Sequence, residues 1–320
     1  MGETVYLGTT DGLFIFDVEG YIARRREQAM HGRQITALAG KGDHLLAAIY
    51  ALGVCRVERR THAFEWCLDA DVLVLAQHPS RPELCVAGTE PASLFRTDDG
   101  GVNWRELKSL REVSDAARWY HPSPSAAPHV KWIAFDPVDP DTFYAGIEIG
   151  GVYRTRDGGV TFERASGGLY DDVHGLAAHP RRREVLYAVT GQGIYVTTDS
   201  ASTWRPANRG LTRRYVTAVA VVAEPVERVV AGASHGPPWN ASHSANAMIF
   251  RCNPPSDAWE VAMDGIPMTL DGAPIGFAAS RAHPGRLYGG VASGELLVSD
   301  GKHWTLLAGD LPPIQAILCA

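Results

Sequence analysis

The chain has 320 residues, of which 45% are hydrophobic and 21% charged, and its formal net charge is −6. This composition is typical of a globular protein with a full core, and the lack of a long basic run argues against nucleic acid as a partner. No apolar run approaches the roughly 20 residues of a membrane-spanning helix, so we expect no membrane partner either.

No basic n-region or apolar h-region precedes the strand predicted at residues 5–8, so we expect no secretory leader. The five cysteines show no CxxC spacing and lie mostly in apolar runs: Cys55, Cys67, Cys85, Cys252 and Cys319. Reduced, buried thiols are typical of a reducing compartment, so we expect a cytoplasmic protein.

Short apolar runs separated by turn residues predict strands along the whole chain. The first three strands are expected at residues 5–8, 13–17 and 21–26. Six groups of strands follow, with inner strands expected to start near Ile35, Val72, Val130, His174, Val216 and Ile275. The last apolar run, residues 314–319, has no further strands after it.

Three segments share one turn pattern: 97–104 (TDDGGVNW), 155–162 (TRDGGVTF) and 197–204 (TTDSASTW). In each, an aromatic residue follows the central Asp by five positions, and a shortened fourth copy occurs at 299–304. A His-Pro or Asp-Pro pair precedes each Asp by 16 to 20 residues, counted from the proline. Two markers in near-constant phase indicate repeats of about 40–45 residues, the period of a four-stranded propeller blade.

We therefore predict an all-β fold, a single seven-bladed β-propeller of four-stranded blades that comprises residues 1–320 as one domain. The N-terminal blade lacks its inner strand, and the lone run 314–319 can supply it. This pairing of the two ends of the chain would remove an open sheet edge.

The repeated turns resemble the Asp boxes (BNR repeats) of sialidases, sortilin-type receptors and photosystem assembly propellers, which implies the propeller fold. In such a turn the Asp accepts backbone N–H bonds, Gly adopts positive φ and the aromatic ring packs between blades. We expect structural roles for the box aspartates and the His-Pro histidines: Asp99, Asp157, Asp199, Asp300, His78, His179 and His283.

Strand direction assigns the connections of such blades to two faces. The His-Pro turns and Asp boxes share one face, while the second-to-third-strand turns and the blade-to-blade linkers share the other. Long irregular segments fall on that other face, at 110–129, 168–174 and 234–246. Long loops in a compact repeat fold are often functional, so we predict a ligand site there, at the mouth of the axial channel.

Polar and aromatic residues of this face are the candidates for ligand binding: Glu90, Trp119, Tyr120, His121, Tyr170, Asp171, Asp172, Tyr215, His235 and Trp239. The tryptophans would supply stacking area and the aspartates polar contacts. Such a surface suits a small molecule, a glycan or a protein partner.

A divalent metal ion is a sharper hypothesis for the same face. His129 and His174 are expected to open successive inner strands, and Glu148 lies on an adjacent turn. Imidazole and carboxylate groups are ligands for divalent transition metals. The alternative is that these side chains are hydrogen-bonded groups of the channel rim, since no local motif such as HExxH accompanies them.

The segments HVKWIAFDP, GIEIGGVYRTRDGG and YDDVHGLAAHP resemble bacterial Asp-box propellers labelled sialidase-like or glycosidase-like. The Phe/Tyr-Arg-Ile-Pro motif of true sialidases is missing here, so a sialidase assignment would rest on the fold alone. We expect a ligand-binding propeller. The alternative is an enzyme at the same face, either a glycan-directed hydrolase or lyase, or a metal-assisted catalyst that uses His129, Glu148 and His174. The sequence assigns no catalytic residue and no particular ligand.

Overall fold

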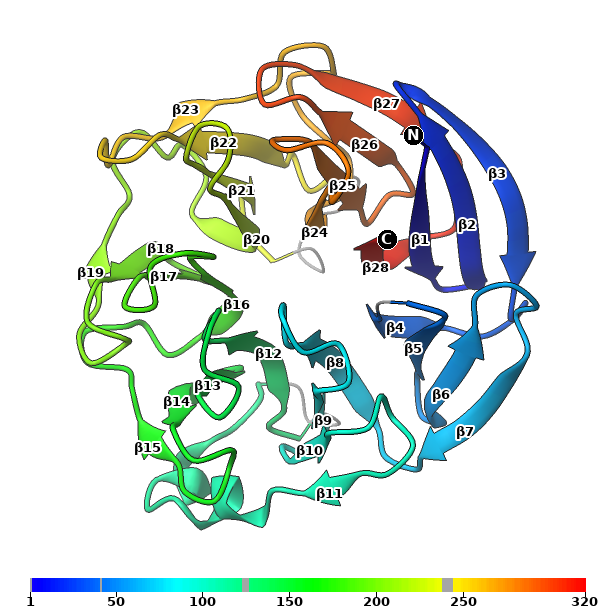
Figure 1. Ribbon diagram of the computed structural model, residues 1–320. Coiled ribbons are helices and arrows are strands. Elements are labelled where there is room, and N and C mark those ends of the chain that lie inside the picture. Colours follow the sequence, from blue (N-terminus) through cyan, green and yellow to red (C-terminus); the bar gives the residue numbers. More distant parts are fainter. Residues whose placement is uncertain (1, 41, 123–126, 238–243) are drawn as a thin grey trace. The chain divides into compact units, whose positions relative to one another are not determined.

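The computed structural model describes residues 2–40, 42–122, 127–237 and 244–320, and this part of the chain is all-β. Its strands form seven four-stranded sheets (Figure 1). Two short 3-10 helices, η1 (Lys108–Glu112) and η2 (Ala116–Arg118), interrupt the strands. Seven such sheets are the blades of a β-propeller, so the predicted fold class is confirmed. Within the described residues, no helix is long and apolar enough to cross a membrane.

The chain divides into two compact units, one comprising Met1–Leu38, Gly191–Ile194 and Ala207–Ala320, the other Ala39–Thr190 and Tyr195–Pro206. The first unit holds the sheets β28 (Ile314–Cys319) with β1 (Glu3–Thr9), β2 (Gly12–Glu19) and β3 (Ile22–Ala29); β20 (Tyr215–Val222), β21 (Arg228–Ser234), β22 (Met248–Cys252) and β23 (Glu260–Val261); and β24 (Pro274–Ala279), β25 (Leu287–Val291), β26 (Leu296–Ser299) and β27 (Trp304–Ala308). The single domain over 1–320 stays a prediction.

The second unit holds two whole sheets and most of two others. These are β8 (Val72–Gln77), β9 (Cys85–Thr89), β10 (Leu94–Thr97) and β11 (Arg105–Glu106); β12 (Val130–Phe135), β13 (Phe143–Ile147), β14 (Gly151–Thr155) and β15 (Glu163–Arg164); β5 (His44–Ile49), β6 (Gly53–Glu58) and β7 (Phe64–Leu68); and β16 (Val173–Ala178), β17 (Leu186–Thr190) and β19 (Arg205–Pro206). The boundary between the units falls within β4 (Ile35–Ala39) and β18 (Gly193–Thr197).

The predicted inner strands are present at the expected places. Three begin at the predicted residue, and the other three begin one residue earlier: Val173, Tyr215 and Pro274. The C-terminal strand β28 pairs with β1, with Val5 opposite Cys319 (Figure 1). The run 314–319 therefore supplies the fourth strand of the N-terminal blade, as predicted.

The three turns with the repeated Asp, here called the Asp turns (97–104, 155–162 and 197–204), are held by their own hydrogen bonds. Asp157 accepts the backbone N–H of Thr161 at 2.9 Å and its hydroxyl at 2.6 Å. Asp99 and Asp199 make the matching contacts in the other two turns. The hydrogen bonds of the Thr203 side chain and backbone lower the pKa of Asp199 to about 2. These contacts occupy the carboxylates within their turns, as a structural role requires.

The His-Pro turns are closed in a related way. The Nδ1 atom of His78 accepts the backbone N–H groups of Ser80 and Arg81 at 3.2 and 3.1 Å. His179 accepts the N–H groups two and three residues further on, at 3.1 and 3.0 Å. Both rings are almost fully buried, so they cap turns rather than face solvent.

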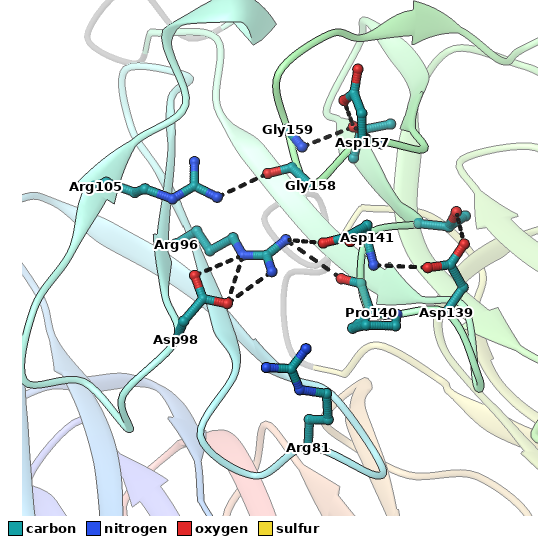
Figure 2. Close-up of polar contacts among 12 residues, drawn as sticks. Arg81, Arg96, Asp98, Arg105, Asp139, Pro140, Asp141, Asp157, Gly158 and Gly159 are labelled. Carbon is teal, nitrogen blue, oxygen red and sulfur yellow. Dashed lines mark hydrogen bonds and ion pairs between the residues drawn. The ribbon is translucent and has the colours of Figure 1, made fainter.

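Charge-assisted hydrogen bonds join two neighbouring sheets of the second unit beside the Asp turns (Figure 2). The buried guanidinium of Arg96, on β10, contacts Asp98 at 2.8 Å and Asp141 of the next sheet at 3.1 Å. Arg105 donates to the carbonyl of Gly158 at 3.2 Å. This end of the two sheets is occupied by contacts within the protein.

Candidate functional site

The candidate site lies at the opposite end of the sheet β12–β15. The Asp turn 155–162 joins β14 to β15, whereas Glu148 lies on the connection between β13 and β14, at the other end of β14. Residue Val130 of β12 pairs with Ile147, and the N–H of Glu148 donates to the carbonyl of His129 at 3.2 Å. The strand register therefore brings His129 beside Glu148.

The turn that carries Glu148 is strained. The residue after it, Ile149, has φ of 53°, a region that β-branched residues rarely adopt. The carbonyl of Asp171, from the segment before β16, accepts the N–H groups of Gly150 and Gly151 at 3.2 and 3.1 Å. Strain of this kind persists only where the surrounding structure holds it, and it often marks functional sites.

Glu148 is a buried carboxylate surrounded by basic side chains. It is 6% exposed, and its Oε2 atom lies 2.6 Å from His129 Nε2 and 3.0 Å from Lys131 Nζ. Its Oε1 atom lies 3.9 Å from His121 Nε2. Burial alone would raise the pKa of Glu148, but the hydrogen bond with His129 and the charge of Lys131 hold it well below its usual range. The group is therefore ionised near neutral pH and serves as an acceptor.

The far side of the His129 ring is held as well. Its Nδ1 atom lies 3.2 Å from the carbonyl oxygen of Ala127 and 3.5 Å from Glu90 Oε2. Glu90 in turn accepts the N–H of Ala127 at 3.1 Å. The ring, 5% exposed, is thus fixed with Nε2 towards Glu148.

A second group of side chains shares Glu148. The Nε2 atom of His174 lies 3.2 Å from Asp172 Oδ1. One ligand atom each from Glu148, Asp172 and His174 lies within 4.8 Å of the others, and the same holds for His121, His129 and Glu148. We call the combined set the Glu148 cluster: Glu90, His121, His129, Lys131, Glu148, Asp172 and His174.

A β-bulge explains how two of these side chains reach the cluster. The pairing of β12 with β13 shifts between Val130 and Trp132, which leaves Lys131 as the extra residue. The same shift between Val173 and Gly175 leaves His174 as the extra residue of β16. Bulges re-aim a side chain. His174 thus corresponds to Lys131, whereas the sequence suggested that it corresponds to His129.

A series of polar contacts, buried at Trp119 and Tyr153, joins the insertion that carries His121 to the sheet. Trp119 Nε1 donates to the Tyr153 hydroxyl at 2.8 Å, and this hydroxyl donates to Asp115 Oδ2 at 2.7 Å. Arg164 joins Asp115 and Asp171, each at 2.6 Å. Burial and the hydrogen bond to Asp115 raise the pKa of Tyr153 to about 12, so its hydroxyl stays a donor. These contacts tie the segments of His121 and Asp172 to one support.

The predicted site residues separate into several groups. Those in the second unit that gather around Glu148 are His129, His174, Glu90, His121 and Asp172. Trp119 is 9% exposed, and Asp171 is paired with Arg164. Tyr120 and Tyr170 are 57% and 38% exposed. Tyr215 and His235 belong to the other unit, and Trp239 lies outside the described residues.

The sequence analysis missed Lys131, Asp115, Tyr153 and Arg164. The bulge that re-aims Lys131 leaves no mark in the hydrophobic pattern, so no local signal indicated this residue. No local sequence pattern indicates the polar contacts that link Trp119, Tyr153, Asp115 and Arg164, because these residues are up to 49 positions apart.

No protein-family model matches the chain. It is 29% identical over 158 aligned residues to an oligoxyloglucan-reducing end-specific xyloglucanase of Emericella nidulans. The alignment covers 41% of this chain and 18% of that protein. The chain therefore aligns with less than a fifth of the length of this relative.

Solved structures with a similar fold include two GH74 enzymes. The GH74 enzyme of Niastella koreensis aligns with a TM-score of 0.68 and 12% identity, over 85% of this chain and 45% of that chain. The GH74 xyloglucanase of Xanthomonas campestris aligns with a TM-score of 0.63 and 14% identity, over 86% and 45%. At these identities the likeness shows the propeller fold alone.

Proposed function

We propose that the chain is a binding propeller, with the Glu148 cluster as its site and a carbohydrate as its ligand class. The observation that carries this proposal is the buried carboxylate of Glu148, which lies within 4 Å of three basic side chains, those of His129, Lys131 and His121. A buried charge of this kind is costly unless it is paired. The turn that carries Glu148 does not itself require basic side chains from several other segments around this carboxylate.

The surroundings of the cluster fit a sugar. Tyr120 precedes His121 and Tyr170 precedes Asp171, and both tyrosine rings are exposed. Hydrogen-bonding groups beside an exposed aromatic ring suit a ligand with hydroxyls and an apolar face. The xyloglucanase names of the similar proteins favour a glycan over other polar ligands.

Catalysis at the same cluster is the second candidate, favoured by those names and by the ionised Glu148. Glycoside hydrolysis needs a general acid with a raised pKa beside its ionised partner. In the described part of the chain, every carboxyl group whose pKa is shifted has it lowered. We therefore keep binding as the first candidate and catalysis as the second.

The test is calorimetric titration of the chelator-treated protein with xyloglucan oligosaccharides. We expect Glu148→Gln to weaken binding at least about tenfold, or about 1.4 kcal/mol. Glu163→Gln, an exposed carboxylate beside an Asp turn, is the matched control and should bind like the original protein. Equal affinity in both variants would contradict the proposed site, and release of new reducing ends would support the catalytic alternative.

A further inference from the structure

We propose that His121, His129 and Glu148 bind a divalent transition-metal ion. This inference rests on the same cluster as the proposed function, but it does not require a carbohydrate. Two imidazole nitrogens and one carboxylate oxygen form the donor set, which suits Zn²⁺, Co²⁺ or Ni²⁺ better than Mg²⁺ or Ca²⁺.

The donor atoms are spaced for one ion. In tetrahedral Zn²⁺ sites, bonds of about 2.0–2.1 Å separate neighbouring ligand atoms by roughly 3.3 Å. The observed separations from Glu148 are 2.6 Å to His129 and 3.9 Å to His121, and all three donor atoms lie within 4.8 Å of one another. Side-chain shifts of about an ångström would bring them to bonding geometry.

The outer contacts of His129 are those of a metal ligand. Histidines that bind metal with one nitrogen usually donate the other N–H to a carbonyl or carboxylate. His129 Nδ1 faces the Ala127 carbonyl and Glu90, while Nε2 faces Glu148. The ring orientation is therefore set before any ion arrives.

His121 is placed by a different support. Its ring lies 5.3 Å from that of His129, centroid to centroid, with the planes 39° apart. It lies two residues after Trp119, whose indole N–H donates to the Tyr153 hydroxyl at 2.8 Å. The side chain of His121 is 17% exposed, so an ion and its remaining water ligand can reach the site.

Asp172 and His174 extend the donor set. Together with Glu148 they form the second group within 4.8 Å. A further oxygen and nitrogen thus lie near the same carboxylate. The shared Glu148 makes it the residue on which all binding depends.

Lys131 competes with the ion. Its ammonium lies 3.0 Å from Glu148 Oε2, where it already neutralises the carboxylate. The Lys131 side chain is 42% exposed, and its flexible stem allows the ammonium to move into solvent. Replacing this lysine should therefore strengthen metal binding, an effect that adventitious binding to surface histidines would not show.

The experiment is titration of the chelator-treated protein with Zn²⁺ by calorimetry, and with Co²⁺ by visible absorption. We expect one ion per chain, at least about 100-fold weaker binding in Glu148→Gln and His121→Gln, and roughly tenfold tighter binding in Lys131→Met. His44→Gln, outside both groups, is the control and should bind as the original protein does. Circular dichroism checks folding. The variants of His121 and Lys131, whose side chains are 17% and 42% exposed, keep the test valid if Glu148→Gln fails to fold.

A dissociation constant weaker than about 100 μM for Zn²⁺, or equal binding in all variants, would overturn the metal proposal. Because carbohydrate binding is measured on the chelated protein, that result leaves the proposed function intact. Loss of carbohydrate binding with stoichiometric Zn²⁺ retained would instead overturn the proposed function alone.

Discussion

The sheet β12–β15 holds an ionised carboxylate at each end, and the two differ in where their partners come from. Asp157 is bonded by Thr161, four residues away, and by Thr155 of the same turn. Glu148 is bonded by His129, 19 residues away, and faces groups from other segments. The hydrogen bonds of Asp157 within its turn account for this residue as a structural group. The basic side chains that reach Glu148 from distant positions are not needed to form its turn, which is why we assign Glu148 to a binding site.

The largest expected effect of a single change is that of Glu148→Gln on ligand affinity. We expect affinity to fall at least tenfold, while the free energy of unfolding falls by only about 1–2 kcal/mol, because Gln can still accept the hydrogen bonds. Urea denaturation beside calorimetry measures both quantities. A loss above about 3 kcal/mol with intact binding would make Glu148 a structural group like Asp157.

Asp157→Ala should show the reverse pattern. Removing the carboxylate leaves turn N–H groups without their acceptor, so we expect about 1–3 kcal/mol lower stability. Ligand affinity should stay within about twofold at low temperature, since Asp157 and Glu148 lie at opposite ends of β14. Selective loss of binding with unchanged stability would show that the two ends have been assigned the wrong roles.

A smaller effect is expected from Trp119→Phe, which removes the indole N–H bonded to Tyr153. We expect about 1 kcal/mol lower stability and several-fold weaker ligand binding, because the segment before His121 is then held less firmly. Trp66→Phe, an exposed position on β7, is the control. Unchanged binding in Trp119→Phe would show that the hydrogen bond between Trp119 and Tyr153 does not contribute to ligand binding.

The smallest expected effect is on the pH dependence of stability. The pKa of Glu148 is lowered by His129 and Lys131 against the effect of burial. A lowered pKa adds stability that is present above the unfolded value of about 4.3 and is lost as pH falls through the folded value. The stability difference between the original protein and Glu148→Gln should therefore be smaller at about pH 3 than at about pH 6. A difference that grows on acidification would contradict the assigned direction.

Repeat spacing predicted much of the fold because it reports local chemistry. The Asp turns and the His-Pro or Asp-Pro turns each close within a few residues, so their phase located the strands that begin at Val72 and Val130, while the apolar run alone predicted the strand that begins at Ile35. The unpaired run 314–319 predicted the pairing of β28 with β1, since a blade with three strands needs a fourth.

The site was predictable only in part. His129 and Glu148 could be matched because neighbouring strand ends meet in a known register. Lys131 could not be predicted, because a one-residue shift in pairing leaves no mark in the hydrophobic pattern. His174 was predicted as a site residue, but its place at a bulge was not. The link from Tyr153 to Asp115 joins residues 38 apart through a buried hydroxyl, and periodicity says nothing about such contacts.

The most direct measurement compares the two ends of β14 in one experiment. Chelator-treated Asp157→Ala and Glu148→Gln are titrated side by side with xyloglucan oligosaccharides at about 10 °C, near the usual temperature of maximum stability. We predict that Asp157→Ala binds like the original protein and that Glu148→Gln loses at least about tenfold in affinity. Retained binding in Glu148→Gln together with lost binding in Asp157→Ala would contradict the assignment of the Glu148 cluster as the site.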